Sequence, residues 1–252
     1  MSRLKVQFLR GAILFIMDRV SVIQKIIDLK KAKLYLEIGV AHGDCFLYVD
    51  APTKIGVDPY LKLKQPKKSI WSFRKISQTN NTYCEISSDA FFESTASTLI
   101  KEGIDVALVD GLHTHEQSLK DVINCLKLLK DNGVIVMHDC NPSSEIAANP
   151  LNPYEHGERL GVPNWKGPWN GDVWKTIAYL RSLRNDLNIF VLDCDYGLGI
   201  ITKGKPENML RYSKEALKKI SYKDLANDRN NILNLKKTSH FKKFTKTLHS
   251  HV

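Results

Sequence analysis

The sequence contains a glycine turn followed by an acid, a combination that can bind a nucleoside. Residues 33–44 read KLYLEIGVAHGD, in which Glu37 precedes Gly39 and Gly43. Gly39 can adopt backbone conformations closed to residues with a Cβ, and Gly43 lets a ligand approach closely where a helix would begin. Asp58 ends the next apolar run, about twenty residues later, where a carboxylate can accept both ribose hydroxyls. The pattern predicts a nucleotide-like cofactor, although two glycines in a turn can also serve packing alone.

Two further apolar runs, residues 104–110 and 133–139, also end in acids. His113 follows the first of these acids and precedes a helix that Thr114 would cap. A positive helix end beside a ligand lowers the pKa of an imidazole, which suits a general base or a metal ligand. The alternative is that His113 only forms a hydrogen bond with the backbone in a tight turn.

The elements that must position these residues are strands of a parallel sheet. Four apolar runs with polar ends predict strands whose carboxyl ends share one edge, at residues 34–38, 54–58, 104–110 and 133–139. A further strand at residues 82–86 precedes Ser88 and Asp89. Asp89 could face an adenine amino group, or this region could instead cap the next helix.

Residues 140–171 form a long segment that contains five of the nine prolines together with Trp165 and Trp169. Loops of this length are usually functional lids or disordered, and the aromatic residues argue against disorder. Because the segment leaves directly from a strand end, we expect it to hang over the ligand crevice. Its tryptophans could stack on an acceptor or could pack within the lid itself.

A helix and a pair of strands complete the predicted fold. Residues 173–187 have apolar side chains at helical spacing, with Asp172 as the expected N-cap. Residues 188–192 and 197–202 read as two strands joined by a short connection, which predicts an antiparallel edge on an otherwise parallel sheet. The sequence thus predicts an α/β fold.

The two ends of the chain differ from its body. Residues 11–30 have apolar residues at helical intervals and predict helices that cover the sheet, while the apolar run at 11–17 is too short to span a bilayer. Residues 205–252 hold twelve basic and four acidic residues, most of the formal net charge of +10. This basic tail, expected to be weakly structured from residue 236, could attract phosphates, acidic glycans or an anionic membrane, or could simply be solvated.

Size and cysteine content indicate the broad class of the protein. A chain of 252 residues with 43% hydrophobic residues suits one α/β domain with a full core. Its five cysteines are scattered and show no CxxC spacing. Reduced thiols in a cytoplasmic protein are the simplest interpretation.

The chain resembles class I S-adenosylmethionine-dependent methyltransferases in motifs that occur in order: LEIGVAHGD, IGVDPY, ISSDAFF, VALVDGLHTHEQSLKDV, NGVIVMHDCNP and WNGDVWK. Within that class it is similar to the bacterial branch related to macrocin O-methyltransferase and cephalosporin hydroxylase. The resemblance covers residues 34–202 and implies a Rossmann-like, seven-stranded, mostly parallel sheet with an antiparallel last strand and helices on both faces. We accordingly expect an N-terminal helical segment (1–32), a cofactor-binding domain (33–204, with a lid at 140–171) and a basic helical extension (205–252).

The resemblance also implies which residues bind the cofactor. Glu37, Gly39 and Gly43 would hold the methionine end of S-adenosylmethionine, Asp58 the ribose, and Ser88 with Asp89 the adenine, while Asp110 would lie beside the transferring methyl group.

A divalent metal such as magnesium is implied in the same way, with Asp110, His138 and Asp139 as its ligands. Relatives often have another acid where this chain has Leu112, so the base is His113 or is absent. The expected catalytic residues are therefore His113 and Asp139. An imidazole in place of a carboxylate suits magnesium less well. Strand alternation would also point His138 and Asp139 to opposite faces unless the strand has already ended.

The leading hypothesis for function is methyl transfer to a hydroxyl oxygen of a small-molecule, glycan or secondary-metabolite acceptor. The basic tail raises the alternative of an RNA methyltransferase, but the absence of a recognisable RNA-binding motif argues against a nucleic-acid partner. A hypothesis of another class is a non-catalytic protein that keeps the fold and docks on anionic lipid as a peripheral membrane protein. A homo-oligomer is a further expectation that the sequence leaves open.

Overall fold

The computed structural model describes residues 8–9, 12–13, 17–63 and 80–248. Two short strands, β1 (Phe8–Leu9) and β2 (Ala12–Ile13), pair antiparallel ahead of helix α1 (Arg19–Lys30). The Asp18 side chain accepts a hydrogen bond from the N–H of Ser21 at 2.9 Å and so caps α1. The predicted helical run is therefore confirmed from Arg19 onwards and wrong at Ala12–Ile13.

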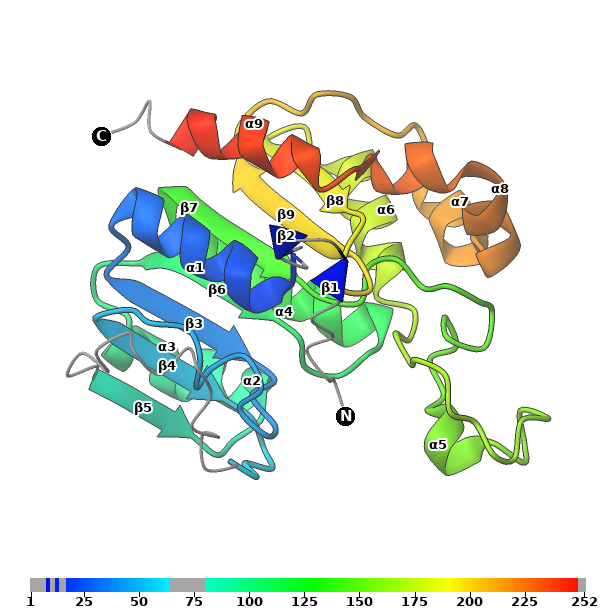
Figure 1. Cartoon of the computed structure of the whole chain (residues 1–252), viewed down its shortest axis with the longest axis horizontal. Coiled ribbons are helices and arrows are strands. Elements are labelled where there is room, and N and C mark those ends of the chain that lie inside the picture. The colour runs from blue at the N-terminus through cyan, green and yellow to red at the C-terminus, as the bar shows by residue number, and fades with distance from the viewer. Residues whose placement is uncertain (1–7, 10–11, 14–16, 64–79, 249–252) are drawn as a thin grey trace.

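The centre of the fold is one sheet with the strand order β10-β8-β9-β7-β6-β3-β4-β5, in which β3 to β9 are labelled in Figure 1. Its members are β3 (Leu34–Ile38), β4 (Thr53–Val57), β5 (Asn80–Cys84), β6 (Ile104–Val109), β7 (Leu129–Met137), β8 (Leu187–Leu192), β9 (Leu198–Lys203) and β10 (Leu235–Lys236). Within this sheet, β9 alone runs antiparallel to its neighbours. The prediction of a Rossmann-like, mostly parallel α/β sheet with an antiparallel last strand is confirmed.

Two details of the sheet differ from the prediction. The sheet has eight strands instead of seven, because the two-residue strand β10 pairs with β8. The antiparallel strand β9 is also not at an edge, since it lies between β7 and β8. Hydrophobic patterning finds a strand but does not tell which neighbours it pairs with.

Alternate residues of the central strands face opposite sides of the sheet, so the fold has two apolar cores. In β6, Val106 and Leu108 belong to one core, whereas Ala107 and Val109 belong to the other. All four side chains are buried, because both faces of the sheet are covered. The continuous apolar run that this produces is typical of a parallel strand at the centre of a sheet.

Helices cover both faces, as predicted. On one face lie α1 and α9 (Ser239–Thr247) (Figure 1). The other face packs against a larger group of helices, α3 (Ala96–Leu99), α4 (His115–Leu128), α6 (Trp174–Leu183), α7 (Lys214–Lys219) and α8 (Tyr222–Leu233).

The starts of α4 and α6 are tied together beside the carboxyl edge of the sheet. Thr114 caps α4 as predicted, with its hydroxyl accepting from the N–H of Gln117. Asp172 is not the N-cap of α6, because that helix begins at Trp174 and Asp172 lies one residue too early. Its carboxylate accepts instead from the N–H of His115 at 2.6 Å, which joins the segment before α6 to the first turn of α4.

The segment after the glycine turn forms irregular turns in place of the expected helix. Lys54 is buried beneath it and donates from Nζ to the carbonyls of Phe46 at 2.7 Å and Val49 at 2.9 Å. A buried ammonium needs such acceptors, and irregular turns have carbonyls that no helical ladder occupies. Lys54 therefore stabilises a non-helical connection between β3 and β4.

The C-terminal residues pack on the body of the protein, so the prediction of a weakly structured tail from residue 236 is wrong. Phe241 and Phe244 of α9 are buried, and the Phe244 ring lies 5.3 Å from that of Phe190 in β8. The apolar residues of α9 share one face, and this amphipathic pattern is what docks the helix. None of the helices in the described part of the chain is long and apolar enough to cross a bilayer. The division into three regions stays a prediction.

Candidate functional site

The carboxyl ends of three neighbouring strands are joined by backbone hydrogen bonds. The N–H of Gly39 donates to the carbonyl of Val57 at 2.9 Å, and the N–H of Asp110 donates to the carbonyl of Ile38 at 2.8 Å. Gly39 has φ of +90°, and a Cβ at this position would lie 2.0 Å from the Asp110 carbonyl oxygen. Only glycine fits here, so the glycine turn and Asp110 are in contact because residue 39 has no side chain.

Asp58 holds the glycine turn in place. Its Oδ2 accepts from the N–H of Ala41 at 2.8 Å, and its Oδ1 accepts from the N–H of Tyr60 at 2.7 Å. Ala41 has φ of +44°, a left-handed conformation that costs a residue with a Cβ about 1–2 kcal/mol. Gly43 follows with φ of +78°. The carboxylate predicted to bind ribose thus lies at the turn and stabilises its backbone.

Glu37, predicted to bind the methionine end of the cofactor, is buried below the turn. Its Oε2 accepts a 2.5 Å hydrogen bond from the hydroxyl of Tyr35. Burial raises the pKa of Glu37 to about 8, outweighing the hydrogen bond from Tyr35, which lowers it. The carboxyl group is therefore mostly protonated at neutral pH, and its position at 1% exposure is that of a core residue.

Ser88 and Asp89 lie in a short helix, α2 (Ser88–Ala90), that continues into a π-helical turn, η1 (Phe91–Thr95). The N-cap is Ser87, one residue before the predicted pair. Gln117 donates to Ser88 Oγ and to Asp89 Oδ1, both at 3.1 Å, and Lys120 pairs with Asp89 Oδ2 at 2.6 Å. Both residues are accordingly connected to α4, at the end of the sheet where an adenine was expected.

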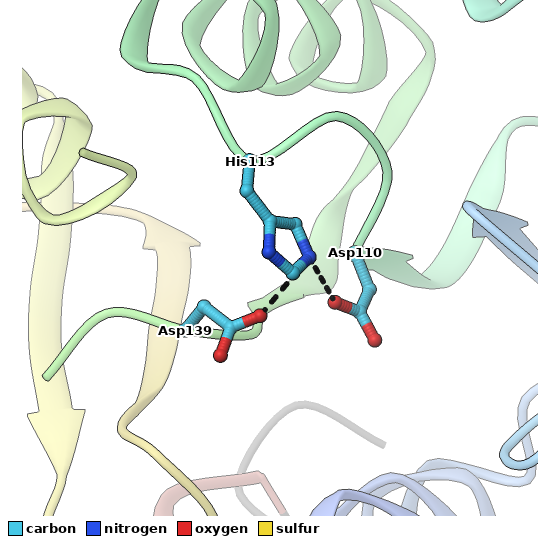
Figure 2. A group of neighbouring side chains, drawn as sticks. All are labelled: Asp110, His113 and Asp139. Carbon is cyan, nitrogen blue, oxygen red and sulfur yellow. Dashed lines mark ion pairs between the residues drawn. The ribbon is translucent and has the colours of Figure 1, made fainter. Parts of the chain in front are cut away.

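The structure brings Asp110, His113 and Asp139 together, although they come from two separate segments (Figure 2). His113 Nε2 lies 3.2 Å from Asp139 Oδ2 and 3.6 Å from Asp110 Oδ1. Burial raises the pKa of Asp110, but His138, His113 and Arg19 outweigh burial and hold it well below its usual range. Asp110 is therefore a carboxylate at neutral pH.

The His113 ring is oriented by the lid. Its Nδ1–H donates to the carbonyl of Trp169 at 3.1 Å, and the two rings lie 4.8 Å apart. Because Nδ1 is the donor, Nε2 is the nitrogen that can exchange a proton with a ligand. Burial lowers the pKa of His113, but the hydrogen bond with Asp110 and the charges of Asp139 and Asp110 raise it more. The expected lowering of this pKa is wrong, because two carboxylates outweigh burial.

His138 and Asp139 point to the same side because the strand has ended before them. β7 ends at Met137, and Asp139 has φ of +61° in the left-handed region. Strand alternation is therefore broken, and His138 Nδ1 lies 3.0 Å from Asp139 Oδ2 and 3.2 Å from Asp110 Oδ1. A non-glycine residue in this conformation is strained, which is common where side chains are aimed into a functional site.

Arg19, the first residue of α1, is a member of the site that the sequence patterns did not indicate. Its Nη1 lies 2.7 Å from His138 Nε2, 3.8 Å from Asp110 Oδ2 and 3.9 Å from Asp195 Oδ2. Burial lowers the pKa of Arg19, but Asp110 and Asp195 raise it above its ordinary value, so the guanidinium stays charged. The only available signal was an arginine just after the N-cap aspartate of a predicted helix, which is common at exposed helix ends.

The lid packs largely on itself. Its helix α5 (Pro153–His156) projects from the body (Figure 1), while Trp165 Nε1 donates to the carbonyl of Pro168 at 3.2 Å and Trp169 Nε1 to that of Asn149 at 2.8 Å. The structure thus shows both tryptophans bonded within the lid, and stacking on an acceptor stays a prediction. Next to Trp169, the fully buried Asn170 donates from Nδ2 to Asp139 Oδ1 at 2.6 Å, which fixes the other side of that carboxylate.

The loop between β8 and β9 forms the far wall of the site. Asp195, Tyr196 and Gly197 have φ of +44°, +61° and +91°. Asp195 Oδ2 lies 3.6 Å from His138 Nε2, and the Tyr196 ring lies 6.0 Å from the His138 ring. A cavity of about 420 Å³ opens here, lined by Asn141, Ser143, Asp193, Cys194, Asp195, Tyr196, Gly197 and Arg229.

The residues at the site can be tested for their fit to a divalent cation. Burial lowers the pKa of His138, but Asp110 and Asp139, which face its Nδ1, raise it well above its ordinary value. Its Nε2 faces Arg19, so neither nitrogen of this ring is free to bind a metal. Asp110, His138 and Asp139, the expected ligands, therefore lie close together, but His138 is not free to coordinate a cation. A different set, Asp110, His113 and Asp139, places three ligand atoms within 4.8 Å of one another. One imidazole and two carboxylates suit Mn²⁺ or Zn²⁺ better than Mg²⁺.

A comparison with known protein families matches the part of the chain that carries Asp110, His113 and Asp139. Residues 36–140, 105 of the 252, match the family model described as a methyltransferase domain. The match includes the glycine turn, Asp58, Asp110, His113 and Asp139. The resemblance to class I S-adenosylmethionine-dependent methyltransferases is confirmed for this domain, and the relation to the macrocin branch stays a prediction.

Solved structures of methyltransferases resemble the chain more distantly. A provisionally named caffeoyl-CoA O-methyltransferase from Staphylococcus aureus is 16% identical, with a TM-score of 0.48 over 75% of this chain and 85% of the other. The methyltransferase PaMTH1 from Podospora anserina, bound to SAH, is 20% identical with a TM-score of 0.44 over 72% and 76%. The O-methyltransferase TomG from Streptomyces achromogenes, in complex with SAM, is 12% identical with a TM-score of 0.45 over 73% and 78%. No curated protein matches the sequence significantly.

Proposed function

We propose that this chain transfers a methyl group from S-adenosylmethionine to a hydroxyl oxygen of a glycan or other small-molecule acceptor. The observation that carries the proposal is the position of His113 between two carboxylates (Figure 2), at the edge of a methyltransferase domain where Gly39 contacts Asp110. An aliphatic hydroxyl does not ionise at neutral pH, so an oxygen methyltransferase needs a group that removes its proton.

The cofactor would bind along the edge formed by β3, β4 and β6. Ala41, within the left-handed turn at residues 39–43, is exposed, which allows a ligand to approach the turn closely. Each Asp58 oxygen accepts one backbone N–H and keeps a further lone pair, so the carboxylate can also accept ribose hydroxyls. When bound, S-adenosylmethionine supplies an electrophilic methyl group on a sulfonium.

His113 is the proposed general base. Its Nδ1–H is fixed by the Trp169 carbonyl, so Nε2 takes the proton of the acceptor hydroxyl while the oxygen forms its bond to the methyl carbon. The electrons of the broken carbon–sulfur bond stay on sulfur, and the proton stays on His113. Asp139 Oδ2, 3.2 Å from Nε2, stabilises the imidazolium that results. The raised pKa of His113 makes the neutral ring a stronger base than a free histidine, and the ring must be deprotonated before it can accept the hydroxyl proton.

A divalent cation is a different way to activate the hydroxyl. Bound by Asp110, His113 and Asp139, such a cation would lower the pKa of the hydroxyl by direct coordination. That arrangement would use the Nε2 lone pair of His113 as a ligand, so the same ring could not be the base. The two possibilities are therefore exclusive, and the charge already present in the site favours the base.

We place the acceptor in the cavity beside the β8–β9 loop. The cavity adjoins the site through Asp195, which contacts His138, and offers acid, amide and hydroxyl groups together with the exposed ring of Tyr196. Asn141 already links its two sides, donating to Asp193 and accepting from Arg229. A wall with carboxylates, amides and one aromatic ring suits a polyhydroxylated ring such as a sugar.

The other expectations about the protein's surroundings stay proposals. The five cysteines are free in the structure, which suits the reducing cytoplasm. The small-molecule or glycan acceptor, contact with an anionic membrane through the basic C-terminal residues, and self-association likewise remain proposals.

Two measurements test the function. Calorimetric titration with S-adenosylmethionine should show one binding site, and transfer of labelled methyl groups should then be followed over a panel of sugars and small alcohols. His113→Ala should lower the transfer rate by about a hundredfold or more, with cofactor affinity unchanged. His156→Ala, an exposed histidine of the lid, is the matched control and should have no effect. Failure to bind S-adenosylmethionine would refute the proposed function. A normal transfer rate in His113→Ala would refute the role of His113 as the general base.

A further inference from the structure

Arg19 provides a fixed positive charge at the centre of an acidic site. Its guanidinium, 19% exposed, contacts His138 and lies within 4 Å of Asp110 and Asp195. Its own backbone N–H also donates to Asp195 Oδ2 at 2.8 Å, so the start of α1 is attached to the loop between β8 and β9. The position of the charge is thus set by the first turn of a helix and not by a flexible loop.

The charges of the site would otherwise be unbalanced. Asp110, Asp139 and Asp195 each have a carboxylate oxygen within 3.6 Å of a His138 ring nitrogen, and their side chains are 15%, 6% and 19% exposed. Three carboxylates so close together repel one another unless cations are interspersed. In many acidic sites a divalent ion fulfils that requirement. Here the guanidinium of Arg19 fulfils part of it from within the chain.

We infer that Arg19 takes the place of a divalent cation in this site, so that Asp110 and Asp139 carry no tightly bound metal and His113 stays free to accept a proton. A guanidinium is suited to this role because it stays charged at neutral pH and its Nη1 lies within 4 Å of His138, Asp110 and Asp195 together. The freedom of His113 as a base rests on the proposed function, whereas exclusion of the metal does not.

Mn²⁺ is the probe for the test, since it accepts both carboxylate and imidazole ligands. Its binding to the full-length protein should be measured by calorimetry for the natural chain, Arg19→Gln, Arg19→Lys and the double variant Arg19→Gln with Asp139→Asn. The natural chain and Arg19→Lys should bind Mn²⁺ weakly, because a positive charge remains. Arg19→Gln should bind at least about tenfold more tightly, because the carboxylates then lose the fixed positive charge of the guanidinium. The double variant should lose that gain, since one ligand is gone.

Equal Mn²⁺ affinity in the natural chain and Arg19→Gln would overturn the inference. Tight Mn²⁺ binding by the natural chain would do so without any variant, which keeps the test decisive even if Arg19→Gln does not fold. S-adenosylmethionine affinity should be measured on the same samples. If Arg19→Gln loses cofactor affinity without gaining Mn²⁺, the guanidinium binds the cofactor instead and the inference fails. Absence of methyl transfer alone would refute the proposed function and leave the Mn²⁺ result standing.

Discussion

Replacing Asp58 separates two roles that the structure gives to one carboxylate. Asp58→Ala removes the acceptors of the Ala41 and Tyr60 N–H groups, each bond to a charged acceptor contributing about 1.5–3 kcal/mol. Both donors lie in exposed residues, so water replaces part of what is lost. We therefore expect the free energy of unfolding to fall by about 1–3 kcal/mol, below the sum of the two bonds.

Asp58→Ala should weaken cofactor binding by more than the loss in its free energy of unfolding would explain. A ribose would lose two hydrogen bonds to the carboxylate, and the left-handed turn at Ala41 would lose its support. Two charge-assisted bonds together correspond to a loss of about a hundredfold or more in the association constant. Calorimetry gives this affinity directly, and denaturant unfolding gives the stability of the same sample.

Two comparison variants separate the role of Asp58 in shaping the turn from its expected role in cofactor binding. Asp58→Asn keeps one carbonyl acceptor and should lie between the natural chain and Asp58→Ala in both measurements. Asp44→Ala removes an exposed acid of the same turn and should change neither. If Asp58→Ala loses stability but keeps full cofactor affinity, the carboxylate only shapes the turn, and the ribose binds elsewhere.

Three further predictions concern the core, the pH dependence and the lid. Phe244→Ala should lower the free energy of unfolding by about 3–5 kcal/mol, because the ring is buried against Phe190; a shift below 1 kcal/mol in denaturant unfolding would mean that α9 does not dock. Burial raises the pKa of Glu37 from 4.5 to about 8. Between pH 4.5 and about 8 the folded protein keeps a proton on Glu37 that the unfolded chain has lost, so the free energy of unfolding falls as the pH rises through this range. Glu37→Gln should abolish this fall, which is at most about 4–5 kcal/mol by 1.4 kcal/mol per pKa unit; an identical pH dependence of unfolding in the variant would exclude Glu37 as its source. Cofactor and acceptor together should reduce proteolytic cleavage within residues 141–170, and equal cleavage with and without ligands would remove the lid role.

The strands and the glycine turn were predictable because their signals are local. A buried parallel strand reads as an uninterrupted apolar run, and β3, β4, β6 and β7 each end near the acid or glycine that the sequence indicated. Hydrophobic spacing likewise located α4, together with its Thr114 cap. The order of the strands carries no local signal, which is why the inserted position of β9 was not predicted.

The parts of the site that the sequence did not predict depend on contacts between residues that are far apart in the chain. Arg19 is separated from Asp195 by 176 positions, and nothing near residue 19 indicates that its helix starts beside the carboxyl edge of the sheet. The raised pKa of His113 has the same origin, because Asp139 reaches it from another strand. Asp139 points there only because it leaves the strand in a left-handed conformation, a feature that residue type does not reveal.

The late position of the β8–β9 loop and of α9 has a consequence for synthesis on the ribosome. The methyltransferase domain at residues 36–140 emerges early, but Asp195 and the helix that covers Phe190 emerge much later. Domains tend to fold as their residues leave the ribosome, and contacts between distant residues form last. Arg19 therefore cannot contact Asp195 until most of the chain has been synthesised. A nascent or truncated chain would carry the glycine turn and Asp110 without Asp195, and the Arg19 guanidinium would then lack one of its carboxylate partners.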